Sequence, residues 1–272
     1  MAHIGRYNLS EISFQRLYTA FKTRWMEIPH AFSWEVQPFA RTNRERIHGF
    51  QGIHAGQRCF IVANGPSLAN TNLELLENEI TFGMNRIYSY FNSSSFRPTY
   101  YLAVDKLVLE QFSGDIKQLE MPKFLNWNSR SLYDPDDPRT IFLKSRMVMR
   151  DSFQEDLTRP LVMGGTVTFV ALQLAYYMGF QKVILVGLDH SYPYKGIPGG
   201  TETRTAVPNE SHFNLNYYPK GAKWKVPDLL RSEIDYSLAR AAFERDGREI
   251  VDATIGGKCQ VFNKVDYPSL FD

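Results

Sequence analysis

The chain has 272 residues, of which 43% are hydrophobic and 22% are charged, and its formal net charge is +2 at pH 7. This composition is typical of a soluble globular protein, and the small net charge argues against nucleic acid as the main partner. Two cysteines, Cys59 and Cys259, are too few for a disulfide framework or a zinc site, which favours a reducing, cytoplasmic setting. No apolar run is long enough to span a membrane, and the N-terminus lacks the order of a signal peptide.

Residues 1–55 differ in character from the rest and are expected to form an appendage to the main domain. Within them, Phe14–Trp25 can form an amphipathic helix, because Leu17, Phe21 and, less cleanly, Trp25 share one stripe. Packing of this appendage on the domain is the plain interpretation. The alternative is contact with a partner or with a membrane surface, which would place the protein at the inner face of the membrane.

The first predicted strand, Arg58–Ala63, runs directly into the turn Asn64-Gly-Pro-Ser-Leu68. Gly65 allows a tight turn with no side chain, Ser67 offers a hydroxyl that can bind or cap, and Asn64 adds an amide. A strand followed at once by such a turn is typical of the first phosphate- or nucleotide-binding corner of a doubly wound fold. The turn matches neither the G-x-G-x-x-G nor the Walker pattern, so NAD or ATP binding by those routes is disfavoured.

Three further strands are predicted over Ile80–Asn85, Pro98–Asp105 and Met121–Asn126, separated by short helices. This alternation predicts an α/β fold over residues 56–272, with a single doubly wound, Rossmann-like, mostly parallel sheet and helices on both faces. In such a sheet the polar residues that follow the strands fall at one edge, and we expect them to share a ligand site. These residues are Asn64, Asn85, Asp105, Asn126 and Asp189.

The stretch Met163–Gly179 is predicted to form a glycine turn followed by a buried helix. Gly164 and Gly165 let the backbone approach a ligand, and Thr166 can cap the helix, so that its free N–H groups face an anion. The apolar run that follows suits an interior parallel strand, with Asp189 at its carboxyl end. A glycine pair before a helix also serves packing alone, so the ligand interpretation depends on the first corner as well.

Asp134-Pro-Asp136 spells the D-x-D with which many sugar-nucleotide enzymes hold a divalent metal. The neighbouring prolines and the lack of a preceding apolar strand favour a solvated turn instead. No metal site is therefore predicted.

Residues 190–226 form a long segment rich in Gly, Pro, Tyr and Asn, which is typical of a lid or binding loop. It contains three candidate catalytic residues, Tyr192, Tyr194 and His212. A helix from Pro227 and a last strand, Glu249–Ala253, complete the domain.

With these motifs the chain resembles the bacterial sialyltransferases of glycosyltransferase family forty-two. It also resembles the broader group of proteins related to an archaeal 6-hydroxymethylpterin pyrophosphokinase. The resemblance covers roughly Cys59–Phe271 and lies in the order of several short motifs. The matching segments are Asn64-Gly-Pro-Ser-Leu68, Asn85, Asn126, Gly164-Gly-Thr166, Gly187-Leu-Asp189 with Tyr192, and Ser211-His212-Phe213.

The resemblance implies a metal-independent, inverting glycosyltransferase of a GT-A variant fold, with no cofactor besides its donor. It implies a CMP-activated, sialic-acid-like keto-sugar acid as donor and a glycan as acceptor, in bacterial cell-surface glycan synthesis. His212 would be the general base, and the hydroxyls of Tyr192 and Tyr194 would stabilise the departing phosphate. The nucleotide would be held by Asn64, Gly65, Ser67, Asn85, Asn126, Gly165, Thr166 and Asp189.

The chain departs from the sialyltransferases at the position before the glycine turn. Those enzymes have an arginine there for an acidic acceptor, whereas this chain has Val162 and Met163 nearby. The donor is therefore better supported than the acceptor. If His212 is not the base, Asp189 and His190 are the nearest candidates.

Two other functions stay open at this point. A diphosphotransferase of the pterin pyrophosphokinase type would use ATP and magnesium and would need carboxylates, for which Asp105, Asp189, Asp134 and Asp136 are candidates. A non-catalytic nucleotide-binding module is the third interpretation. The sequence also leaves a homo-oligomer open.

Overall fold

The structure is a computed structural model that describes residues 14–146, 151–191, 197–203, 212–213 and 217–272. It divides into two compact units, Met1–Arg41 and Thr42–Asp272. The first unit holds helix α1 (Phe14–Val36), which is longer than the helix predicted over Phe14–Trp25. No helix in the described ranges is long and apolar enough to cross a membrane.

Helix α1 carries an exposed apolar stripe. Phe21, Trp25, Ile28 and Phe32 follow one another at helical spacing, and their exposed fractions lie between 52% and 67%. The rings of Phe21 and Trp25 are stacked with centroids 6.1 Å apart. The amphipathic character expected from the sequence is therefore present in the described part of α1.

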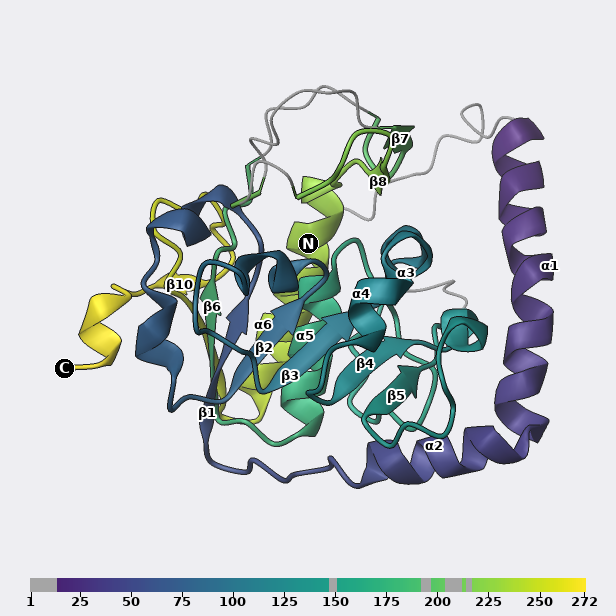
Figure 1. The fold of residues 1–272 in the computed structure, drawn as a ribbon, viewed down its shortest axis with the longest axis horizontal. Helices are drawn as coiled ribbons and strands as arrows, with labels where there is room; N and C mark the ends of the chain where they lie inside the picture. Colours follow the sequence, from purple (N-terminus) through teal and green to yellow (C-terminus); the bar gives the residue numbers. More distant parts are fainter. Residues whose placement is uncertain (1–13, 147–150, 192–196, 204–211, 214–216) are drawn as a thin grey trace, which may run out of the picture. The chain divides into compact units, whose positions relative to one another are not determined.

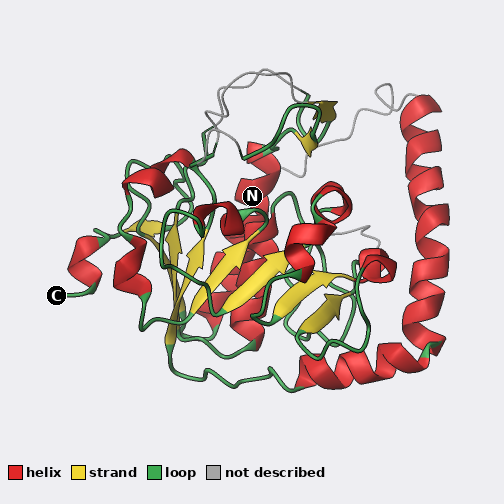
Figure 2. Cartoon of the chain, in the orientation of Figure 1, coloured by secondary structure: helices red, strands yellow, loops and turns green. Residues whose placement is uncertain are grey.

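The second unit is built on an eight-stranded, all-parallel sheet, which confirms the predicted α/β, Rossmann-like fold (Figure 1). The strand order is β10-β9-β6-β1-β2-β3-β4-β5. Figure 2 shows the strands in yellow with the helices in red around them. The strands are β1 (Arg58–Val62), β2 (Thr81–Met84), β3 (Tyr100–Ala103), β4 (Lys123–Asn126), β5 (Thr140–Leu143), β6 (Lys182–Val186), β9 (Glu249–Asp252) and β10 (Asn263–Lys264). A separate antiparallel pair joins β7 (Thr201–Thr203) to β8 (Lys223–Lys225).

Five described α-helices and several 3-10 turns connect or flank the strands of the sheet. Helix α5 (Val167–Tyr177) is the most central, because ten of its residues are buried and it contacts β1, β2 and β3. It passes behind the sheet beside α6 (Leu229–Arg245) in Figure 1. The other connections are α2 (Pro38–His48), η2 (Pro66–Asn70), η3 (Leu73–Leu76), η4 (Ile87–Tyr90), α3 (Lys106–Gln111), α4 (Ser113–Lys117), η5 (Trp127–Leu132) and η6 (Pro268–Leu270).

The topology places a crevice between β1 and β6. From β1 the chain proceeds to β2, β3, β4 and β5 on one side, and it later returns to β6 and continues to β9 and β10 on the other side. The two central strands pair in parallel from Arg58 with Lys182 to Val62 with Val186, so their carboxyl ends coincide. The loops that leave these ends diverge, and this is where open α/β sheets bind ligands.

The edge strand β5 was not predicted from the sequence, and a side chain protects it. Asn43 Nδ2 donates to the Phe142 carbonyl oxygen over 2.7 Å, and the Phe142 N–H donates to Asn43 Oδ1 over 2.8 Å. An asparagine thus replaces a neighbouring strand and blocks further pairing at this edge.

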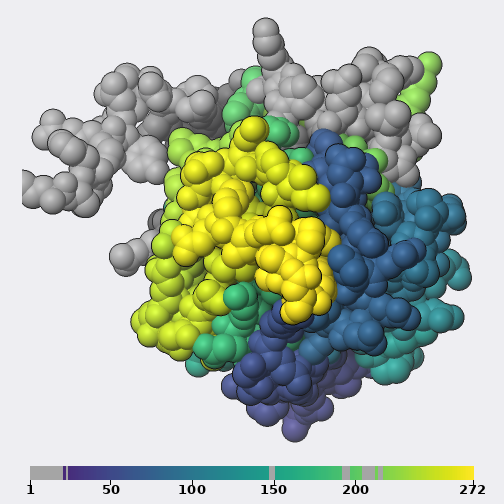
Figure 3. Space-filling model, turned by 90° about the vertical axis from the view of Figure 1, so that its left-hand side faces the viewer, coloured from purple at the N-terminus to yellow at the C-terminus, as the bar shows by residue number. Residues whose placement is uncertain are grey.

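The C-terminal residues close the opposite side of the sheet. Figure 3 shows them in yellow between the blue segment that follows β1 and the yellow-green helix α6. The Phe271 ring stacks on Phe60 with centroids 5.8 Å apart, and the Tyr267 hydroxyl donates to the Asn72 carbonyl oxygen over 2.8 Å. These contacts tie the tail to the first strand and to the loop after it.

A chain that begins at Pro38 should fold and should bind nucleotide as well as the full protein does. A cavity at the carboxyl edge of the sheet is lined by described residues between Ala63 and Tyr236 only. The truncation also keeps Asn43 on the β5 edge. Circular dichroism melting with and without CMP would measure both properties. A truncated protein that is folded but no longer binds nucleotide would assign part of the site to residues 1–37.

Candidate functional site

A cavity of about 440 Å³ lies at the carboxyl edge of the sheet, at the crevice between β1 and β6. Its walls come from the loops that follow β1, β2, β3 and β6, from the amino ends of α5 and α6, and from the segment around β8. Of the five polar residues expected to share a site, four line this cavity: Asn64, Asn85, Asp105 and Asp189.

Asp189 joins the two loops that diverge at the crevice. Its Oδ1 accepts from the Ser67 N–H over 3.0 Å, and its Oδ2 accepts from the Ser67 hydroxyl over 2.7 Å. Burial raises the pKa of the Asp189 carboxyl, and the two hydrogen bonds from Ser67 offset part of that rise. Asp189 and Ser67, which the sequence predicts to bind the nucleotide, therefore bind each other and fix the conformation of the turn after β1.

Gly65 is required by this clamp. A Cβ atom at position 65 would lie 1.8 Å from Asp189 Oδ2 and 2.6 Å from the Gly187 carbonyl oxygen. No side chain fits there, because both neighbours are held by other bonds. Gly65 is therefore needed because the loops after β1 and β6 pack too closely for a side chain at this position.

Asn64 and Asn85 line the cavity, and each has one buried side-chain oxygen that is unpaired among the described residues. Asn64 Nδ2 donates to the Met84 carbonyl oxygen over 2.8 Å, which fixes the amide, while Asn64 Oδ1 is buried without a hydrogen-bond partner among the described residues. The same holds for Asn85 Oδ1, and Asn85 has φ 49°, a left-handed conformation that asparagine tolerates. A buried polar atom with no partner costs about 1–3 kcal/mol, so donor groups of a ligand would stabilise both sites.

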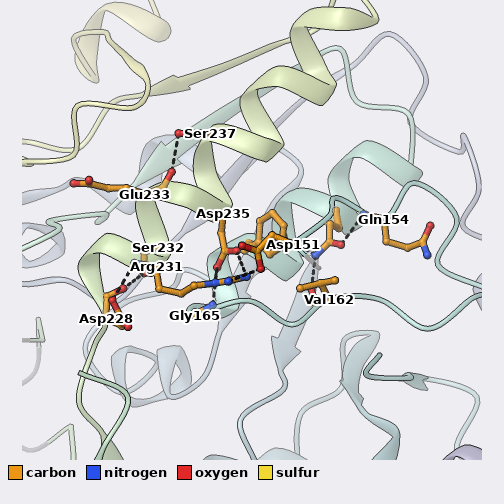
Figure 4. Close-up of polar contacts among 12 residues, drawn as sticks. Asp151, Gln154, Val162, Gly165, Asp228, Arg231, Ser232, Glu233, Asp235 and Ser237 are labelled. Atoms are coloured by element: carbon orange, nitrogen blue, oxygen red, sulfur yellow. Dashed lines mark hydrogen bonds and ion pairs between the residues drawn. The ribbon is translucent and has the colours of Figure 1, made fainter. Parts of the chain in front are cut away.

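The glycine turn before α5 is held by a buried carboxylate on α6 (Figure 4). Asp235 Oδ2 accepts from the Gly165 N–H over 2.7 Å, and Arg231 Nη2 donates to Asp235 Oδ1 over 2.8 Å. Burial raises the pKa of the fully buried Asp235 carboxyl, and the bonds from Gly165 and Arg231 counteract that effect. Sequence reasoning missed Asp235, because 70 residues separate it from its partner.

The residues of this turn are otherwise positioned as predicted. Gly164 has φ 66°, and a Cβ atom there would lie 2.5 Å from Asp235 Oδ2. Thr166 is the N-cap of α5 and accepts from the Thr168 N–H over 3.3 Å. The amino end of α5 therefore lies at the cavity, where the positive end of the helix dipole suits an anionic ligand.

Asn126, the fifth strand-end residue, is outside the cavity lining. Its Nδ2 donates to the Val104 carbonyl oxygen over 3.1 Å, and its Oδ1 accepts from the Asn128 N–H over 3.0 Å. The amide thus caps η5 and links two strand ends. It lies at the predicted edge, but both of its polar atoms are engaged by the protein.

The segment around β8 forms one side wall. Lys225 Nζ lies 3.2 Å from Asp105 Oδ2, and the Gln111 side chain forms two hydrogen bonds with the backbone of Lys223. Asp105 also accepts from the Leu107 N–H over 2.7 Å and so caps α3. The described part of the long loop is thereby attached to α3 and faces the strand ends.

His212 lines the cavity within an aromatic cluster. Its ring stacks on Tyr217 with centroids 4.0 Å apart and planes 11° apart, and Tyr218 meets it edge-on at 5.5 Å. Tyr217 accepts at its hydroxyl from the Arg86 N–H over 3.0 Å, and the Phe213 N–H donates to the Asn64 carbonyl oxygen over 3.2 Å. His212 therefore lies beside the first corner, as the motif order predicts. Tyr192 and Tyr194 lie outside the described residues.

His190 is a second histidine at the cavity. It directly follows Asp189, has φ 54°, and its Nε2 lies 3.0 Å from Glu233 Oε1 on α6. The sequence points to His190 only as a substitute base and gives no sign of its partner, which is 43 residues away.

The D-x-D segment forms an exposed turn. Asp134 Oδ1 accepts from the Asp136 N–H over 2.9 Å in an exposed loop that leads to β5. Within the described ranges, no group of three or more His, Cys, Asp and Glu side chains is arranged to hold a metal ion.

Comparison with known proteins shows a matching family model and a similar solved structure. The model of the family described as 6-hydroxymethylpterin diphosphokinase MptE-like matches residues 36–195, more than half of the chain. The MAf glycosyltransferase from Magnetospirillum magneticum AMB-1 matches with a TM-score of 0.49 and 12% identity, over 84% of this chain and 38% of that one. This chain thus spans well under half of that protein's length. No curated protein matches.

Gly65→Ala should destabilise the protein by about 1–3 kcal/mol, because the added methyl group would overlap the Asp189 carboxylate and force the clamp apart. Gly114→Ala is the matched control, since a Cβ there meets nothing within 4 Å. Urea unfolding of both variants would measure the difference. Equal stability of the two variants would contradict the clamp.

Proposed function

Since the chain belongs to the family of 6-hydroxymethylpterin diphosphokinase MptE-like proteins, we propose that it is a transferase that holds a nucleotide in this cavity. The proposed donor is a CMP-activated keto-sugar acid of the sialic acid type, and the proposed acceptor is a hydroxyl of a glycan. This would be a step of bacterial cell-surface glycan synthesis. The proposal agrees with the resemblance to the sialyltransferase motifs.

The observation that carries the proposal is the convergence of these motifs on one cavity. The first corner, the glycine turn, the Gly187–Asp189 strand end and His212 are far apart in the sequence, and all of them line it. Packing alone does not require a histidine and two unpaired asparagine acceptors at the same cavity. The exocyclic amino group of cytosine is a donor of the kind that those acceptors lack.

The proposed reaction is a single displacement. The acceptor oxygen attacks the anomeric carbon of the sugar, the bond from that carbon to the phosphate oxygen breaks, and CMP leaves with the electron pair. The proton of the acceptor hydroxyl passes to His212. Backbone N–H groups at the amino end of α5 are suited to stabilise the charge that develops on the phosphate.

The carboxylates of the cavity favour a reaction without an obligatory metal. Asp189 accepts two hydrogen bonds from Ser67, Asp105 binds Lys225 and a backbone N–H, and Asp228 accepts from the Arg231 N–H over 3.0 Å. A metal ion would have to displace protein donors from these oxygens. This supports the metal-independent proposal.

The family description favours a second candidate, the transfer of diphosphate from ATP. In that reaction a hydroxyl attacks the β-phosphorus of ATP with magnesium bound, and AMP leaves. Both candidates therefore transfer a group to a hydroxyl and release a nucleoside monophosphate. A non-catalytic nucleotide-binding module would bind the nucleotide without releasing a product.

Addition of CMP without metal should raise the melting temperature. A ligand at roughly 100 times its dissociation constant adds about 2.7 kcal/mol to the stability, which is measurable by differential scanning fluorimetry. The panel would contain CMP, CTP, UDP, GDP and ATP, each with and without magnesium. A shift with ATP and magnesium alone would favour the diphosphotransferase instead.

His212→Ala should lower turnover by roughly 10²- to 10⁴-fold and leave CMP affinity nearly unchanged, because a general base faces the acceptor and not the nucleotide. Hydrolysis of a CMP-sugar by water can serve as the assay where no acceptor is known. His212→Phe keeps a ring against Tyr217, and it should be as slow as His212→Ala. His48→Ala, an exposed position on α2, is the control. Unchanged turnover in the His212 variants would remove this residue from the mechanism.

A further inference from the structure

We propose that His190, which lines this cavity and is held by Glu233, is a second acid–base residue beside His212 and donates a proton to the departing phosphate. The proposal rests on the proposed function, since it needs a nucleoside monophosphate as leaving group. It holds for either candidate reaction, because both release one. His190 is the proposed catalytic residue, and Glu233 is a positioning residue that acts through it.

The first argument is the geometry of the pair. The His190 side chain is only 6% exposed and lines the cavity, and its Nε2 is bonded to Glu233 Oε1 at 3.0 Å. Glu233 therefore occupies one ring nitrogen and fixes the orientation of the imidazole. Nδ1 has no hydrogen bond to any described residue, so it is the nitrogen left for a ligand. In the protonated ring both nitrogens are donors, so Nδ1 can donate while Nε2 stays bonded to Glu233.

The second argument is the backbone. His190 has φ 54°, and a residue with a Cβ atom in this region is held there against a preference of about 1–2 kcal/mol. The preceding Asp189 is bonded at both ends: its side chain binds Ser67, and its carbonyl oxygen accepts from the Lys258 N–H over 2.9 Å. Neighbouring bonds thus hold the strained conformation that presents the imidazole, a pattern typical of functional sites.

The third argument is that both histidines of the cavity are attached to the turn that follows β1. His190 is joined through Asp189 to Ser67, and His212 is joined through Phe213 to Asn64, so the two histidines are attached to the same turn from different loops. A displacement with an anionic leaving group has two proton-transfer sites, one at the attacking oxygen and one at the departing oxygen. Two histidines at one corner match these two sites.

Each proton that moves in this step has a named donor and a named acceptor. The acceptor oxygen forms the new bond and loses its proton to His212. The bond to the departing phosphate oxygen breaks, and that oxygen receives the electron pair and the Nδ1 proton of His190. Exchange with solvent then restores both histidines.

The His190–Glu233 pair contributes little to the stability of the fold. The Glu233 side chain is 47% exposed, and ion pairs of such exposure contribute about 0–1 kcal/mol. Glu233 points away from Arg231 and Asp235, the two α6 residues that fix the glycine turn (Figure 4). Helix α6 thus holds the His190 ring and the glycine turn through different faces.

Binding of product and of nucleoside tests the contact. His190→Gln should weaken the binding of CMP about tenfold or more and leave the binding of cytidine unchanged, because only CMP carries the phosphate. The affinities for AMP and adenosine are compared in the same way, because AMP is the product of the other candidate reaction. His48→Gln, on the exposed face of α2, should change neither. A melting curve of each variant checks that it is folded.

Leaving groups of different acidity test the proton transfer. With the CMP donor, His190→Gln should slow turnover by roughly 10²-fold or more. With a nitrophenyl glycoside of the same keto-sugar acid, whose leaving group needs no proton, the loss should be less than about threefold. Glu233→Gln should show the same dependence in weaker form, and Glu244→Gln, an exposed position on the same helix, should show none. His212→Ala should slow both donors.

The outcomes separate the two proposals. If the unaltered protein binds neither CMP nor AMP, the proposed function and this inference fail together. If it binds one of them and His190→Gln leaves the ratio of monophosphate to nucleoside affinity unchanged, only the inference fails. Equal losses with both donors would likewise assign His190 a purely structural role.

Discussion

The site depends on one interaction, the binding of the Ser67 N–H and hydroxyl by the buried Asp189 carboxylate. A carboxylate at this depth must be bonded, because burial disfavours its charged form. Its donors come from the loop after β1, whereas Asp189 itself follows β6, so the bond spans the point where the chain diverges. The absence of a side chain at Gly65 and the left-handed conformation of His190 are both tied to this clamp.

A second carboxylate repeats the same principle on the other side of the cavity. Asp235 binds the Gly165 N–H and is neutralised by Arg231, so that the turn before α5 is fixed to α6. In each case a buried acid shapes a turn and is thereby occupied. In the proposed function, the groups left for a ligand are the two asparagines, the amino end of α5 and the two histidines, all of which line the cavity.

The sequence predicted those parts of the site that follow from local pattern. Strand-end residues such as Asn64 and Asp189 meet because parallel strands end at one edge, and the order of apolar runs is enough to find them. Partners such as Asp235 and Glu233 could not be predicted, because their positions on α6 depend on how that helix packs. Asn126 was predicted to bind the ligand because it lies at the carboxyl edge of the sheet. Its amide instead forms hydrogen bonds with the backbone of Val104 and Asn128. The edge strand β5 was missed although it has four residues, as many as the predicted strands β2, β3 and β4.

The two halves of the cavity differ in how they are held, and this explains why the motifs indicate a donor but no acceptor. In the proposed function, the donor half consists of strand ends and helix starts whose geometry is fixed by the sheet. The described part of the other half, from Tyr217 to Lys225, is attached by side-chain bonds to Gln111 and Asp105. Substitutions there leave the sheet intact, so the fold places few constraints on the residues that face an acceptor. A local motif can therefore persist in the first half while the second half changes with the acceptor.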